Sequence, residues 1–299
     1  MEKFFESLFK FDRDETTGEM LHFKLFELYM VYHIIWTVWY WGMYTLRISD
    51  VVLPLGIAQY IDITFMYGNS LPLINAALIS LLVVLTWFRL TPSWTYMLVL
   101  VLMHFQYVAR YSLGEISHGA HMTAATLLCF ALGLLFFKSS KESRRFIMGA
   151  VFFFVGLSYV SAGVSKLIGT GPFWIDGRHL WLWMGEKGID ILSREGAFGN
   201  NWLQELAWTS RGMATLILLS GLLIELGGFL FWFERFRPYI ATITIGMHLG
   251  IMATMNIRFD ASIAQLIVIG YPWALLFNYM LINRDAVRQK TQNLLQRLM

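Results

Sequence analysis

The chain has 299 residues, of which 57% are hydrophobic and 14% are charged. Soluble domains carry about 25% charged residues, and the deficit here extends along the whole chain, which excludes a soluble domain with one membrane anchor. The net charge of +3 is too small to indicate a nucleic-acid partner. At roughly 20 residues per span, the length allows about eight membrane-spanning helices. We therefore expect an all-α, polytopic transmembrane helical bundle.

Residues 1–20 form the first predicted element, a short amphipathic helix that lies on the membrane surface. Its apolar side chains Phe4, Phe5, Leu8, Phe9 and Phe11 fall roughly on one side. The segment lacks the apolar core and the small-residue cleavage site of a signal peptide.

Eight apolar runs follow, and together they predict one transmembrane domain over residues 21–282. The predicted spans are 23–46, 71–90, 93–113, 119–137, 146–168, 212–233, 239–256 and 261–282. The Trp-rich stretch 169–210 separates the fifth span from the sixth. Because Trp prefers the headgroup level, we expect short interfacial helices there. Residues 283–299 are predicted to be a basic cytoplasmic tail.

The basic residues of the connections predict an orientation. Lys138, Lys141, Arg144 and Arg145 follow the fourth span, and eight spans place the basic tail on the same side of the membrane. The positive-inside rule makes that side cytoplasmic, so both termini are expected inside. Residues 169–210 then face outward.

Lys166 is the strongest candidate for chemistry. It lies where the fifth apolar run meets a segment broken by Gly and Pro, within residues 157–177. A lysine there can extend its amine toward the membrane surface, which is the structural alternative. A desolvated lysine instead loses its proton more readily, and a neutral amine can accept a proton from a weak acid.

Two further titratable residues lie in the middle of predicted spans. Glu225 must be protonated or paired, and its candidate partners are His248, Arg110 and Lys166. His248 must face the bundle interior, either in a structural interhelical hydrogen bond or in a functional site. Gly246 and Gly250 flank His248 and would permit close approach of a neighbouring helix.

His118 and His121 share one face at the start of the fourth span, because they are three residues apart. They could bond to headgroups or backbone, transfer protons, or contact a substrate. Two histidines alone are a weak metal motif, and we expect no bound metal. For Glu27, His33 and His104 the sequence favours structural or interfacial roles.

The run SYVSAGVSKL, followed by FWIDG, is similar to the lysine motif of the vitamin K-dependent gamma-glutamyl carboxylase superfamily and its bacterial HTTM (horizontally transferred transmembrane) members. The matching residues are Ala162, Gly163, Val164, Lys166, Leu167, Trp174 and Gly177. The span with Glu225 and the later His248-x-Gly250 match the family's later helices in order and spacing. The resemblance covers residues 20–282 and implies a bacterial cytoplasmic membrane protein.

The resemblance also implies a reaction. Lys166 would deprotonate a reduced vitamin K or menaquinol-like quinol at the outer membrane face, to drive oxidation or carboxylation. His121 or His118 would assist, His248 and Glu225 would belong to the substrate or cofactor pocket, and Trp174 and Asp176 would shape its outer mouth. The expected partners are a membrane lipid or quinol and, if the chain modifies one, a secreted peptide or protein substrate.

Two departures from the animal enzyme argue against carboxylation of protein glutamates of the animal type. We expect no large lumenal part after the spans, and Ser165 stands where that enzyme has a second lysine. The alternative is a non-enzymatic lipid-binding, peptide-maturation, export or immunity factor with the same fold. A transporter is a third interpretation, but the sequence lacks the paired broken helices that usually indicate one.

Overall fold

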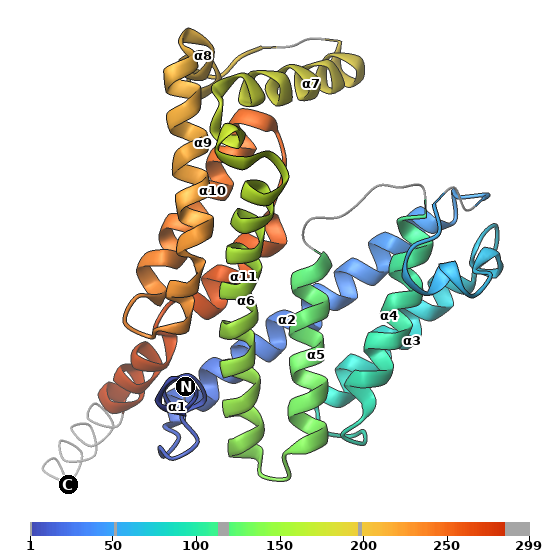
Figure 1. The fold of residues 1–299 in the computed structure, drawn as a ribbon. Coiled ribbons are helices and arrows are strands. Elements are labelled where there is room, and N and C mark those ends of the chain that lie inside the picture. Colours follow the sequence, from blue (N-terminus) through green and yellow to red (C-terminus); the bar gives the residue numbers. More distant parts are fainter. Residues whose placement is uncertain (1, 51–52, 113–119, 197–198, 285–299) are drawn as a thin grey trace, which may run out of the picture. The chain divides into compact units, whose positions relative to one another are not determined.

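The computed structural model describes residues 2–50, 53–112, 120–196 and 199–284, and all regular elements in these ranges are helical. The predicted all-α class is thus confirmed. The chain forms two compact units, one comprising residues 1–150 with 272–299 and the other residues 151–271 (Figure 1). The predicted tail 283–299 lies almost entirely outside the described residues.

The first unit is a group of long helices. It contains α1 (Glu2–Phe9), α2 (Thr17–Thr45), α3 (Leu71–Trp87), α4 (Thr95–Arg110), α5 (Ala120–Phe136), the first turns of α6 (Ser140–Thr170) and a last helix, Trp273–Arg284. Two short 3₁₀ helices, η1 (Gly56–Gln59) and η2 (Thr64–Met66), lie between α2 and α3. Helix α2 packs against α3 and α4, and α4 packs against α5.

Buried aromatic rings and one buried amide hold these helices together. The ring of Phe130 in α5 lies 5.7 Å from that of Phe23 and 5.5 Å from that of Phe26, both in α2. The side chain of Gln106 in α4 is fully buried, and its Nε2 donates to the carbonyls of Val38 and Pro72. Because a buried amide is costly unless it is bonded, Gln106 fixes how α2, α3 and α4 pack.

Helix α2 begins with a capping box. The Thr16 hydroxyl accepts from the backbone N–H of Glu19, and the Glu19 carboxylate accepts from the backbone N–H of Thr16. This reciprocal pair satisfies two N–H groups that have no partner inside a helix. The predicted surface helix over residues 1–20 is therefore too long: α1 ends at Phe9, and a new helix begins at Thr17.

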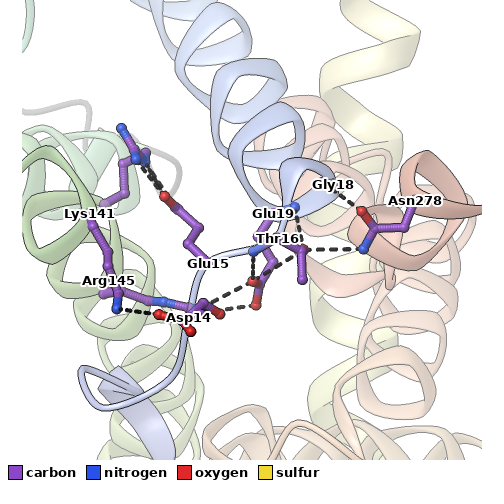
Figure 2. Close-up of polar contacts among 9 residues, drawn as sticks. Asp14, Glu15, Thr16, Gly18, Glu19, Lys141, Arg145 and Asn278 are labelled. Carbon is purple, nitrogen blue, oxygen red and sulfur yellow. Dashed lines mark hydrogen bonds and ion pairs between the residues drawn. The ribbon is translucent and has the colours of Figure 1, made fainter. Parts of the chain in front are cut away.

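An ionic clasp, formed by Asp14, Glu15, Glu19, Lys141, Arg144 and Arg145, joins the start of α2 to the start of α6 (Figure 2). Each basic residue has its own acid: Lys141 contacts Asp14, Arg144 contacts Glu15, and Arg145 contacts Glu19. Asn278 of the last helix accepts from the Gly18 N–H at 2.8 Å and donates to the Thr16 hydroxyl. The clasp explains why α6 begins at Ser140, six residues before the predicted span.

The second unit contains the rest of α6 and the elements up to Tyr271. These are η3 (Gly171–Ile175), α7 (Gly177–Glu195), α8 (Trp202–Thr209), α9 (Arg211–Leu226), η4 (Gly227–Trp232), α10 (Arg237–Met255) and α11 (Asp260–Gly270). Leu180 and Met184 of α7, Ala207 of α8, and Ala214 and Leu218 of α9 form a buried apolar cluster. Of the helices in the stretch 169–210, η3 and α8 are short, as predicted, whereas α7 has 19 residues.

Among the residues that the structure describes, three helical segments are long and apolar enough to cross a membrane: Ser140–Ile175, Arg211–Trp232 and Arg237–Met255. A fourth is possible if α11 and the helix Trp273–Arg284, which meet at a bend of 51°, count as one span. They coincide with the last four predicted spans and indicate a multi-pass membrane protein.

Candidate functional site

Lys166 lies one turn before the end of α6, close to the point where the helix must stop. Gly171 has a φ of +67°, which favours glycine, and Pro172 cannot donate the backbone hydrogen bond that would continue the helix. The short helix η3 begins at Gly171 and carries Trp174. The break thus returns the chain toward the end of α6, where the Trp174 ring centroid lies 4.7 Å from the Lys166 Nζ atom.

Small residues of α6 allow close contact with the end of α9 and with η4. A Cβ atom added to Gly163 would lie 3.0 Å from Leu226, and one added to Gly156 would lie 2.9 Å from the Gly228 carbonyl oxygen. Lys166 follows Gly163 by three residues and therefore lies on the same face of α6. The same close packing brings Lys166 beside Glu225, the penultimate residue of α9.

The Lys166 ammonium donates to Glu225 Oε1, and the two side chains form an ion pair. Glu225 is only 9% exposed in its side chain, whereas Lys166 is 28% exposed. Of the three candidate partners for Glu225, the structure therefore selects Lys166. The other carboxylate oxygen, Oε2, is buried and has no hydrogen-bond partner among the described residues. A hydroxyl or N–H donor on a bound molecule would satisfy this oxygen.

A second polar pair involves α6 and α10. The Tyr159 hydroxyl lies 2.8 Å from His248 Nε2, and both side chains are buried. The His248 ring also stacks on Phe259 at 4.5 Å. The ring's other nitrogen, Nδ1, is buried without a partner in the described part of the chain. The interhelical hydrogen bond expected of a deep histidine is thus present, and one nitrogen remains for another donor or acceptor.

The two pairs lie along one face of α6. Tyr159 precedes Lys166 by seven residues, which is two helical turns or about 10 Å. The site therefore holds an ion pair and a Tyr–His pair, each with one buried polar atom still unsatisfied. Sequence reasoning missed Tyr159, although its seven-residue spacing from Lys166 could have indicated it.

The expectation that Gly246 and Gly250 permit close helix approach near His248 is wrong. A Cβ atom added at either position meets nothing within 4 Å. Close glycine contacts in this unit occur instead at Gly156, Gly163 and Gly177, which meet α9 and η4, at Gly228, which meets α6, and at Gly270, which meets Ala241 of α10.

Asp176 stabilises the turn that follows Trp174. Its carboxylate caps α7 by accepting from the Arg178 backbone N–H, and it pairs with the guanidinium groups of Arg178 and Arg211, each at 2.7 Å. The hydrogen bonds from Arg178, together with Arg211, hold the pKa of the Asp176 carboxyl well below its usual range. This arrangement ties the start of α7 to the start of α9.

The predicted histidine pair is described only in part. His118 lies outside the described residues. His121 is exposed at the start of α5, in the first unit, with its ring 6.4 Å from that of Tyr107. Lys166 belongs to the second unit. A histidine that assists Lys166 from α5 thus stays a prediction.

Within the described ranges, no three His, Cys, Asp or Glu side chains are grouped so that they could hold a metal ion. A surface depression of about 530 Å³ is lined by Asn200, Glu205, Trp208 and Thr209, at α8, and not by the Lys166 pair. The whole chain matches no known family model, no curated protein and no solved structure.

Proposed function

We propose that the protein is an eight-span membrane protein of the vitamin K-dependent carboxylase-like type. The spanning segments of the second unit support this placement, as does α2, whose 29 residues extend about 43 Å. In this arrangement both termini are cytoplasmic, and η3, α7 and α8 lie at the outer membrane face.

The proposed activity is deprotonation of a quinol, such as reduced vitamin K or a menaquinol, at Lys166. The ion pair with Glu225 has no net charge. The proton that the two groups share can lie on Glu225, which leaves Lys166 as a neutral amine. When that amine accepts a proton from a quinol hydroxyl, Lys166 becomes an ammonium and Glu225 stays a neutral acid. The resulting quinolate carries the balancing negative charge. Oxidation or carboxylation would follow from this anion, as the resemblance implies.

One observation carries the proposal: the lysine of the family-like motif pairs with a buried carboxylate that keeps one oxygen unsatisfied. Charged groups are retained inside a membrane protein mainly where they serve a function, and Lys166 and Glu225 both lie in spanning segments. Trp174 beside the amine offers an aromatic surface on which a quinol ring could stack.

Analysis of the lipids that co-purify with the protein tests this proposal. The expected result is an isoprenoid quinone, enriched over its level in the source membrane and depleted in the Lys166→Ala variant. A matched control is Lys187→Ala, because Lys187 contacts only exposed acids of α7. A protein that co-purifies with phospholipid or peptide alone, with no quinone, would instead support the alternative of a non-enzymatic lipid-binding, export or immunity factor.

A further inference from the structure

Glu27 of α2 holds two cations at once. Its carboxylate is completely buried. Lys24 Nζ lies 2.8 Å from Oε2, and Arg89 makes a bidentate contact, with Nη1 2.8 Å from Oε1 and Nη2 3.2 Å from Oε2. Arg89 alone would neutralise the carboxylate, so Lys24 leaves this group of three with one positive charge in excess.

The excess charge is accessible. The side chains of Lys24 and Arg89 are 44% and 43% exposed, although the carboxylate that they share is not. An ammonium has three N–H donors, and the contact with Glu27 uses one of them. Lys24 also lies over the ring of Trp87, whose indole N–H is buried without an acceptor among the described residues. Lys24 therefore keeps two unused N–H donors, and the indole ring beneath it carries a third.

In the ionic clasp of the same unit, by contrast, the positive and negative charges are equal in number. There Lys141, Arg144 and Arg145 have one acid each, so the folded clasp has no excess charge. Among the ion pairs described in the first unit, those of the clasp are thus balanced, whereas the group of Glu27, Lys24 and Arg89 is not.

The turn that carries Arg89 is apolar on both sides. Phe88, Leu90 and Trp94 are each more than half exposed, and Arg89 itself adopts a φ of +60°. Exposed aromatic and apolar side chains next to exposed cations are typical of the level at which acyl chains meet headgroups. Lys24 lies in the second turn of α2, which is long enough to carry it beyond the hydrocarbon layer.

We propose that Lys24 and Arg89 bind the phosphate diester of an anionic phospholipid. One phosphate diester carries one negative charge and thus balances the excess. Its oxygens would accept the unused N–H groups of Lys24 and Arg89, and its acyl chains would cover Phe88, Leu90 and Trp94. The site rests on the membrane placement proposed above and not on the quinol chemistry of Lys166, which belongs to the other unit.

Native mass spectrometry of the full chain in detergent tests the site. The protein is incubated with equal amounts of phosphatidylglycerol and phosphatidylcholine that carry the same acyl chains. The wild type should retain phosphatidylglycerol preferentially. Lys24→Gln should bind it about fivefold more weakly, since one basic residue near a membrane surface contributes about that factor. Lys24→Gln leaves the bidentate contact between Arg89 and Glu27 in place, so the variant should fold.

Lys141→Gln is the matched control, because Lys141 belongs to a balanced pair and its loss should change phosphatidylglycerol binding less than twofold. Equal loss in Lys24→Gln and Lys141→Gln, or no loss in Lys24→Gln, would overturn the proposal. Inorganic phosphate at about 10 mM, enough to occupy an anion site with a Kd of about 1 mM, should leave the lipid bound. Displacement of the lipid by phosphate would show that the site takes a free anion and would also refute a lipid site.

Discussion

Among single side chains, Asp176 offers the clearest pH test. Folding lowers its pKa, so its ionised carboxylate stabilises the folded protein at every pH above roughly 4, where the unfolded carboxyl titrates. This stabilisation is lost only as the pH falls further, toward the lower pKa of the folded state. Asp176→Asn should therefore lower the Tm by a constant amount between pH 7 and pH 5, and the difference from wild type should shrink below about pH 4.

Thermal unfolding of the detergent-solubilised protein across this pH range measures the effect. Asp190→Asn is the control, since the Asp190 carboxylate contacts only Lys187 in α7, at 3.4 Å. Its Tm should match that of the wild type. An Asp176→Asn variant that is as stable as wild type at pH 7 would show that the contacts with Arg178 and Arg211 contribute nothing.

At the scale of helices, glycines decide how closely α6 approaches α9 and η4. In Gly156→Ala the new methyl group would lie 2.4 Å from Trp232 Nε1 and 2.9 Å from the Gly228 carbonyl, and the latter is backbone that cannot move aside cheaply. We expect this variant to lose about 1–3 kcal/mol of stability, as for other overpacked contacts.

Gly221→Ala is the matched control for Gly156→Ala. Gly221 lies inside α9, where an added methyl group meets nothing within 4 Å. It should gain about 0.5–1 kcal/mol, because alanine is the better helix former. Chemical denaturation of both variants measures the difference, and equal stability would argue against the close packing that places Lys166 beside Glu225.

At the scale of the whole chain, the apolar runs predicted the helices well, because a membrane requires long uninterrupted apolar segments. The observed helix bounds differ from the predicted bounds where polar contacts join segments that are distant in the sequence. Helix α6 begins early because Arg144 and Arg145 pair with acids near the N-terminus. The break before α2 is marked in the sequence by Thr16, three residues before Glu19, a capping pattern that the predicted helix over residues 1–20 passes over.

The sequence predicted individual residues of the candidate site, but it did not predict how they pair. The lysine motif and the cost of buried charge indicated Lys166 and Glu225, but the sequence left three partners open for the carboxylate. The choice of Lys166 depends on the packing of α6 against α9 at Gly163, which a single sequence does not reveal. Tyr159 was missed because a tyrosine in an apolar helix is ordinary until its hydroxyl is seen beside His248.

Proton transfer at Lys166 can be measured without the later steps of the reaction. A naphthol with an isoprenoid chain mimics the quinol but has one hydroxyl and is not readily oxidised, and its anion absorbs at longer wavelength than its neutral form. Bound to the wild type at pH 7, it should show the absorbance of the anion. Bound to Lys166→Arg, it should stay neutral, because an arginine can keep the pair with Glu225 but does not act as a base. A naphthol that stays neutral on the wild type, or ionises equally on both proteins, would contradict the assignment of Lys166 as the base.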